Sequence, residues 1–129
     1  MRSIIAIFIC ITAIVAVNIY PLKAQTPEQL YQKGLLKEEG EGNLQEAINL
    51  YKQVAENIKA DQSIRAKALL HIGMCHEKLG TEEAVKTYQR LVTSFPAQKN
   101  EVNLARERLS VLVKPSEKVA ERLFTGTIC

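Results

Sequence analysis

One phrase occurs twice in this chain, 37 residues apart. Residues 42–54 read Gly-Asn-Leu-Gln-Glu-Ala-Ile-Asn-Leu-Tyr-Lys-Gln-Val, and residues 80–91 read Gly-Thr-Glu-Glu-Ala-Val-Lys-Thr-Tyr-Gln-Arg-Leu. In register, Ala47 falls on Ala84 and Tyr51 falls on Tyr88. Self-similarity at a fixed period of this size is typical of stacked helical repeats, in which each unit buries its apolar face against its neighbours. The phrase therefore predicts an all-α fold of antiparallel helix-turn-helix units.

The N-terminal segment is typical of an export signal. A positive start at residues 1–3 precedes an uncharged apolar run at 4–17, and the segment ends in Leu22-Lys23-Ala24. This order predicts a signal peptide over residues 1–24, although Leu22 stands where a small residue is preferred. The alternative is an uncleaved anchor in the inner membrane formed by residues 4–20, about 25 Å long as a helix against a bilayer core of ~30 Å. We therefore expect an exported protein, periplasmic or secreted, with membrane contact only if this segment is retained.

The net charge gives no support for a nucleic-acid-binding function. Removing Arg2 and Lys23 with the signal from the 17 Lys and Arg leaves 15 basic side chains against 14 acidic ones. The charges are uneven along the chain, because residues 28–56 contain six Glu and three Lys while residues 57–108 contain nine basic and six acidic side chains. Such a dipolar surface suits the orientation of a protein partner. Of the cysteines, Cys75 and Cys129 remain after cleavage, and they predict no disulfide framework.

Apolar residues at helical spacing predict five helices over residues 25–113. Thr26-Pro27 begins the first helix, Asn43 caps the second, the third begins near Asp61 or Ser63, and Thr81 caps the fourth. The remaining boundaries are Glu39 to Gly42 after the first helix, Leu79-Gly80 after the third, Pro96 after the fourth, and Gln98 to Val113 for the fifth. The inward residues of the second helix are expected to be Leu44, Ala47, Ile48, Tyr51, Val54, Ala55 and Ile58. The whole is about two repeats and a C-terminal capping helix, close to the minimum of about three repeats for a stable stack.

The second unit resembles a tetratricopeptide repeat, whose pattern is W-x2-L-G-x2-Y, then A-x3-F, then P. The matching residues are Leu69, Ile72, Gly73, His76, Ala84, Tyr88 and Pro96. The first unit is a looser match, with Gly34, Ala47 and Tyr51 but no closing proline. Gly34 to Ala47 spans 13 residues where Gly73 to Ala84 spans 11, so the first turn is longer. The resemblance covers residues 27–113 and is greatest to the exported bacterial type.

The resemblance implies a non-catalytic module that binds a protein or peptide partner in the cell envelope, without a cofactor. In this family the first helix of each pair lines a concave groove. The corresponding positions here are Glu28, Tyr31, Gln32, Leu35, Lys67, Leu70, His71, Met74, Glu77 and Arg106. Apolar anchors mixed with charges suit a peptide groove. The alternative is that these are ordinary, partly buried surface residues.

The chain contains little that could carry out catalysis. His71 and Cys75 are four residues apart on one helix face, but a structural zinc site needs four ligands and His76 points elsewhere. A metal-dependent enzyme at His71 and Cys75 is therefore the weakest alternative, and we predict no metal site. The acidic run of Glu38, Glu39 and Glu41 is expected to be a solvated helix end.

The segment 114–129 is expected to lie outside the repeat domain. Lys114-Pro115-Ser116 predicts a helix stop, followed by a short helix over 118–123 or an isolated strand over Val119 to Thr125. Residues 122–126, Arg-Leu-Phe-Thr-Gly, resemble the linker into a WD40-like β-propeller. The alternative function is therefore an accessory N-terminal segment of a larger propeller protein, with no specific ligand of its own.

Overall fold

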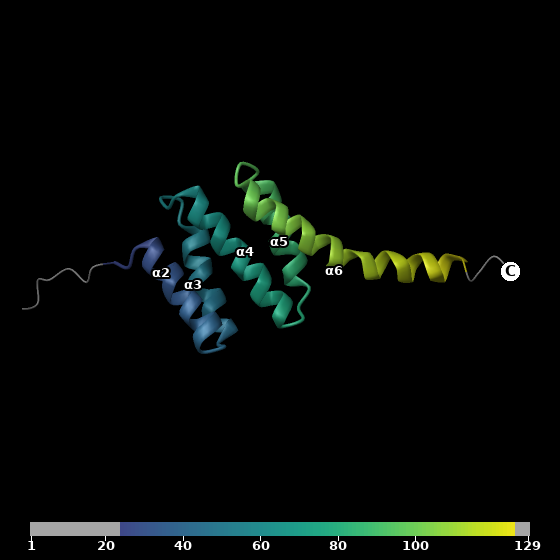
Figure 1. Cartoon of the computed structure of the whole chain (residues 1–129), viewed down its shortest axis with the longest axis horizontal. Coiled ribbons are helices and arrows are strands. Elements are labelled where there is room, and N and C mark those ends of the chain that lie inside the picture. The colour runs from purple at the N-terminus through teal and green to yellow at the C-terminus, as the bar shows by residue number, and fades with distance from the viewer. Residues whose placement is uncertain (1–23, 126–129) are drawn as a thin grey trace, which may run out of the picture.

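A computed structural model describes residues 24–125, with side chains described through Val113. The predicted signal segment 1–24, except for Ala24, lies outside the described residues, as does Cys129 of the tail. The elements in chain order are α2 (Pro27–Leu35), the π-helical turn η2 (Leu36–Gly40), α3 (Leu44–Glu56), α4 (Gln62–Lys78), α5 (Glu83–Ser94) and α6 (Lys99–Thr125). This range contains no strand, and Figure 1 shows the helices stacked in order along the molecule. The predicted all-α fold of helix-turn-helix units is confirmed.

Three of the four predicted helix starts are capped as the sequence indicates. The hydroxyl of Thr26 accepts a hydrogen bond from the backbone N–H of Gln29, whose side chain in turn accepts from the Thr26 N–H. Asn43 and Asp61 likewise accept from backbone N–H groups in the first turns of α3 and α4. Each cap satisfies a donor that has no partner within its own helix.

The predicted cap at Thr81 is wrong. Its hydroxyl donates to the carbonyl of His76 at 3.1 Å, at the end of the preceding helix, and α5 begins after Glu82 without a side-chain cap. The turn passes through Gly80 at a φ of +67°, which directs Thr81 back toward the free carbonyls of α4. Thr81 therefore closes the end of α4.

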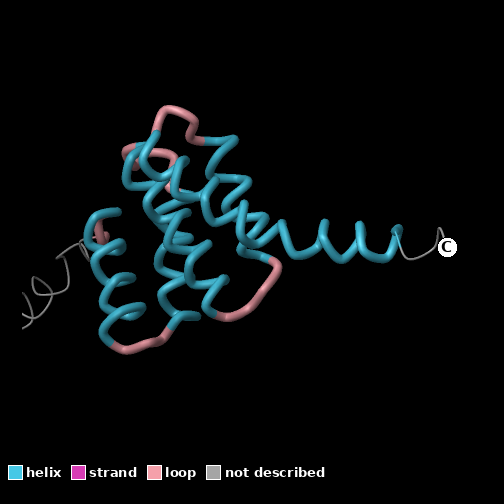
Figure 2. Tube along the Cα trace, turned by 45° about the vertical axis from the view of Figure 1, so that its right-hand side comes forward, coloured by secondary structure: helices cyan, strands magenta, loops and turns pink. Residues whose placement is uncertain are grey.

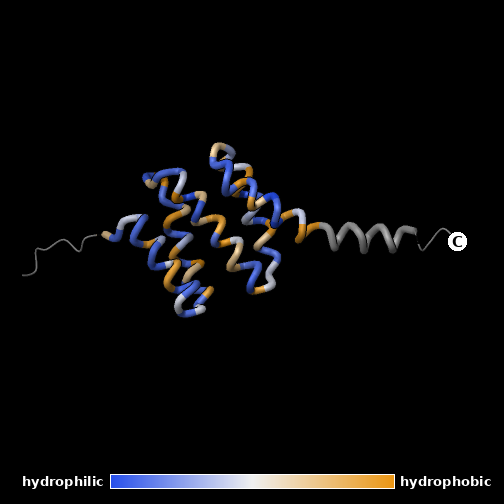
Figure 3. Tube along the Cα trace, in the orientation of Figure 1, coloured by the Kyte–Doolittle hydropathy of each residue, from blue (hydrophilic) through white to orange (hydrophobic). Residues whose placement is uncertain are grey.

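The helices pack as two layers, with α4 at the centre. Each helix packs on the next in the chain, α2 also contacts α4, and α4 also contacts α6, whereas α3 and α5 have no comparable contact. The first helices of the pairs therefore form the inner, concave side of the stack. Buried residues occur all along α4 because it has neighbours on several sides, and Figure 2 shows the helices packed around one another. Figure 3 shows the alternation of hydrophobic and hydrophilic residues along the helices. The largest fully buried side chains are Tyr51, Tyr88, Ile48, Leu69, Leu91, Val54 and Cys75.

Two details of the first pair differ from expectation. Ile58 was expected inside but is 83% exposed, because α3 ends at Glu56 and the extended backbone of Asn57 directs the chain away. The longer first turn is accommodated by η2, in which the N–H of Glu41 bonds to the carbonyl of Leu36 at 3.1 Å. Helical structure thus continues to Gly40, and the extra residues form a wider helical turn rather than a loop.

The predicted helix stop at Lys114-Pro115-Ser116 is also wrong, because α6 continues through it to Thr125. A proline inside a helix removes one backbone hydrogen bond and costs roughly 3 kcal/mol. The residues that follow are mostly good helix formers (Glu, Lys, Ala, Arg and Leu), which offsets part of that cost. The isolated strand over Val119 to Thr125 is excluded by the same observation. Figure 1 shows this end of α6 extending beyond the other helices.

No helix within residues 24–125 is both long enough and apolar enough to cross a membrane.

Candidate functional site

Each helix pair contains a glycine on its first helix and a tyrosine on its second that touch. A Cβ atom on Gly34 would lie 2.6 Å from Cε1 of Tyr51, and one on Gly73 would lie 2.4 Å from Cε1 of Tyr88. Both tyrosine rings are fully buried. A buried ring fits at these crossings because the facing residue has no side chain.

A glutamate follows each of these glycines by four residues and accepts the tyrosine hydroxyl. Tyr51 donates to Glu38 at 3.0 Å, and Tyr88 donates to Glu77 at 2.9 Å. Residues four apart share a helix face, so the two residues meet the same tyrosine. The glycine leaves room for the ring, and the glutamate accepts the hydrogen bond of the hydroxyl. This relationship occurs in both pairs, and the spacing Gly-x3-Glu in the sequence was the signal that could have indicated it.

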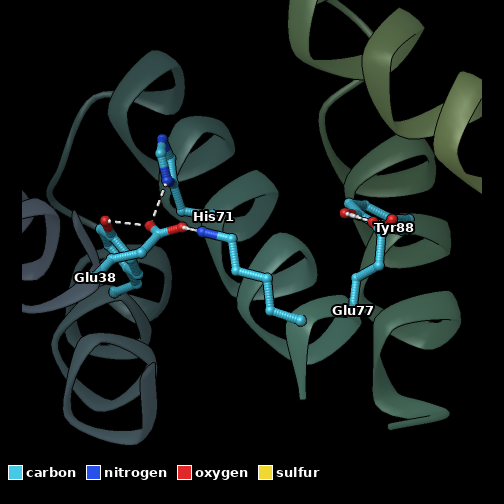
Figure 4. A network of polar contacts seen from close by, with 6 residues as sticks. Glu38, His71, Glu77 and Tyr88 are labelled. Carbon is cyan, nitrogen blue, oxygen red and sulfur yellow. Dashed lines mark hydrogen bonds and ion pairs between the residues drawn. The ribbon is translucent and has the colours of Figure 1, made fainter. Parts of the chain in front are cut away.

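Glu38 is the centre of a buried polar network (Figure 4). One oxygen accepts from Tyr51 and from Nδ1 of His71 at 2.8 Å, and the other accepts from Nζ of Lys78 at 2.7 Å. The residue is only 5% exposed. The prediction of a solvated acidic run is therefore wrong for Glu38, because η2 turns this side chain toward α4, while Glu39 and Glu41 are exposed as expected.

The network is charged at neutral pH. Burial raises the pKa of Glu38, but the hydrogen bonds from Lys78, His71 and Tyr51 outweigh burial and hold that pKa below its usual value. The hydrogen bond to Glu38 raises the pKa of Lys78. Burial and then the Glu38 hydrogen bond raise the pKa of Tyr51, which stays a donor. A carboxylate so placed satisfies every donor that faces it.

Glu77 forms the corresponding network one pair further along (Figure 4). It accepts from Tyr88 and from Arg108 of α6, the latter at 3.3 Å, and its side chain is 27% exposed. Burial and then Glu77 raise the pKa of Tyr88. Glu38 thus joins its own helix pair to α4, and Glu77 joins the next pair to α6. These links fix the three inner helices relative to one another.

The inner face of α2 and α4 carries an aromatic cluster beside a hollow. The ring of Tyr31 lies 5.6 Å from that of Tyr51 and 5.6 Å from that of His71, edge-on to the latter. Next to Tyr31 is a hollow of about 290 Å³. Its lining residues are Glu28, Tyr31, Gln32, Asp61, Ser63, Ile64 and Lys67. Four of the ten predicted groove residues, Glu28, Tyr31, Gln32 and Lys67, therefore meet at one place.

The other predicted groove residues do not share this hollow. Met74 lines a second hollow, between α4 and α6, with Glu77, Lys78 and Arg108. Leu35 lines a third hollow with Gln32, beside η2. Leu70 is only 8% exposed and belongs to the core.

On α6, the arginine that reaches the inner side is Arg108. Arg106 is exposed and lines none of these hollows, whereas Arg108 bonds to Glu77 and borders the second hollow. Side chains two positions apart on a helix point in directions that differ by about 200°, so the two arginines point to nearly opposite sides. The repeat pattern does not determine this rotation of α6, which depends on its packing against α5.

The residues considered for a metal site are engaged otherwise. Nδ1 of His71 bonds to Glu38, and Cys75 is fully buried, with burial raising the pKa of its thiol to about 12. Metal coordination requires the thiolate. Within residues 24–113 no three His, Cys, Asp or Glu side chains are grouped so that they could hold a metal ion.

A family model for the tetratricopeptide repeat matches residues 67–97, which cover most of α4 and all of α5. Neither the curated proteins nor the solved structures include a significant match to the chain. With the all-helical stack, the match supports a protein of tetratricopeptide-repeat type. Proteins of this type generally bind other proteins and are typically non-catalytic.

Proposed function

We propose that this chain is a non-catalytic scaffold of the bacterial cell envelope that binds a peptide or protein partner on its concave face. The observation that carries the proposal is a pair of hollows between the inner helices, one between α2 and α4 next to Tyr31 and one between α4 and α6 next to Met74. Apolar side chains in such hollows give affinity, and the surrounding charges orient a partner.

The inner helices are also fixed before any partner arrives. The Glu38 and Glu77 networks join them through side chains that make hydrogen bonds to more than one helix. A surface held in its final shape loses less conformational entropy on binding than a flexible one. This supports a binding role for the concave face over a role as a simple spacer.

The test is affinity capture from envelope extract with the purified chain and three variants. Met74→Ala and Lys67→Glu change the concave face, and Ile58→Ala removes an equally apolar but remote exposed side chain. We expect a partner that is captured by the wild type and by Ile58→Ala and is reduced with the other two, with all four proteins melting at similar temperatures. A partner captured equally by all four would contradict binding at this face.

Export is part of the proposal and rests on the sequence of residues 1–24. N-terminal sequencing of the protein isolated from its host should give Gln25 as the first residue. A chain that retains Met1 and fractionates with membranes would favour the anchored alternative.

An accessory role in a larger propeller protein has one structural observation in its favour. The backbone of α6 extends beyond the packed helices (Figure 2), as a connection to a further domain would. The reading frame downstream of residue 129 tests this alternative, because it requires propeller sequence there.

A further inference from the structure

The hollow between α2 and α4 combines apolar walls with an excess of carboxylates. Tyr31 and Ile64 supply the apolar surface, and both are partly buried. Glu28 and Asp61 line the hollow against a single ammonium group, that of Lys67. The local balance of charge is therefore negative.

The charges elsewhere on the concave face increase this imbalance. The cations nearest the second hollow are already compensated, because Lys78 pairs with Glu38 and Arg108 pairs with Glu77. In contrast, neither Glu28 nor Glu101 forms an ion pair with any described residue. The intramolecular pairs thus neutralise the basic end of the groove and leave the end near Tyr31 acidic.

The pKa of the Tyr31 hydroxyl reflects its burial and this excess of negative charge. Burial raises its pKa, and the charges of Glu38, Glu39 and Glu101 raise it further. Glu101 belongs to α6, so carboxylates from both sides of α4 act on the same place. An aromatic ring surrounded by negative charge is a favourable site for a cation, through the ring quadrupole and through direct attraction.

We propose that this hollow binds a lysine or arginine side chain of the partner, with an adjacent apolar residue of the partner seated against Ile64. The proposal rests on the proposed function, since it names the chemistry of the peptide that the concave face would take. The cation lies against the ring of Tyr31, between Glu28 and Asp61. The positive charge of Lys67 repels such a cation and would attract an acidic side chain. Lys67 is therefore expected to weaken binding of this ligand, whereas Glu28 and Asp61 strengthen it.

The test is selection from a random 12-residue peptide library on the purified full chain, followed by affinity measurement of the selected peptides. We expect enrichment of Lys or Arg next to an apolar residue, and loss of binding when that residue is replaced by the uncharged citrulline or norleucine. Glu28→Gln should weaken the selected peptide about 1.5- to 5-fold, and Lys67→Gln should strengthen it by a similar factor, as expected for exposed charge pairs.

Two matched variants control for net charge alone. Glu82→Gln and Lys86→Gln make the same charge changes at the start of α5, where both residues line a different hollow, and should alter affinity less than 1.5-fold. Selected peptides rich in Asp or Glu, or reversed effects of the two groove variants, would overturn this inference while leaving concave-face binding intact. No selected peptide, or peptides insensitive to Lys67→Gln, Glu28→Gln and Met74→Ala together, would overturn the proposed function as well.

Discussion

Gly73 and Tyr88 touch so closely that the position of the ring depends on the glycine. A Cβ atom at residue 73 would lie 2.4 Å from Cε1 of the tyrosine, well inside the contact distance of two carbon atoms. The same relationship holds between Gly34 and Tyr51, at 2.6 Å. Both rings are buried and cannot move aside without disturbing the core.

Gly73→Ala and Gly34→Ala should therefore destabilise the fold. The added methyl group must displace a buried ring, and overpacking of this kind costs about 1–3 kcal/mol. Gly40→Ala is the control, because its Cβ would meet only the end of the flexible Leu36 side chain at 3.0 Å. Denaturant unfolding followed by circular dichroism measures all three. Equal stability of Gly73→Ala and Gly40→Ala would contradict the close helix crossing.

The two tyrosine hydroxyls should differ in their contribution to stability. Tyr51→Phe removes a hydrogen bond to the buried carboxylate of Glu38, and such a bond contributes about 1.5–3 kcal/mol. Tyr88→Phe should cost less, because the Glu77 side chain is 27% exposed and water can replace the lost donor. The free energies of unfolding of the two variants, measured under identical conditions, give the comparison. A larger loss for Tyr88→Phe would show that exposure does not govern these bonds.

The helices were predictable from the sequence because their signals are local. Apolar spacing and capping residues such as Thr26 and Asn43 lie within a few positions of the structure that they determine. The role of Glu38 was not, because its burial depends on a π-helical turn and on His71 and Lys78, which lie 33 and 40 residues away. An acidic run reads as solvent-exposed until its distant partners are known.

The candidate site was predictable to the level of the helix but not of its rotation. The resemblance to tetratricopeptide repeats implied that Tyr31, Lys67 and Met74 line the inner side, and each of them borders a hollow in the structure. On α6, packing against α5 sets which face turns inward, and it is Arg108 that bonds to Glu77 and borders a hollow. Tertiary contacts, which no single segment encodes, decide such rotations.

Cys75 should resist alkylation in the native protein. Its side chain is fully buried, and burial raises the pKa of the thiol to about 12, so both access and thiolate are lacking at pH 8. Iodoacetamide treatment with peptide mass mapping should show modification at Cys75 only after denaturant is added. Cys129, which lies outside the described residues, provides a second thiol in the same digest for comparison. Rapid modification of Cys75 without denaturant would indicate that α4 opens locally.

Stability should depend on acid pH through Glu38. Its pKa in the folded protein lies below the usual 4.5, so its contribution to stability is present above about pH 4.5 and is lost as the pH falls through the folded value. Glu38→Gln removes this ionisation while keeping the shape of the side chain. We expect the wild type to exceed the variant in free energy of unfolding at pH 7, and the difference to shrink as the pH falls below 4.5.

The pKa of Lys78 is raised by its hydrogen bond to Glu38. We therefore expect the free energy of unfolding to decrease a second time at alkaline pH, beginning above the usual pKa of 10.5. Glu41→Gln is the control, since this exposed carboxylate bonds to Lys37 at the surface and should change the acid limb much less. A difference between wild type and Glu38→Gln that is constant from pH 3 to pH 7 would mean that the carboxylate at residue 38 is not charged in the folded protein.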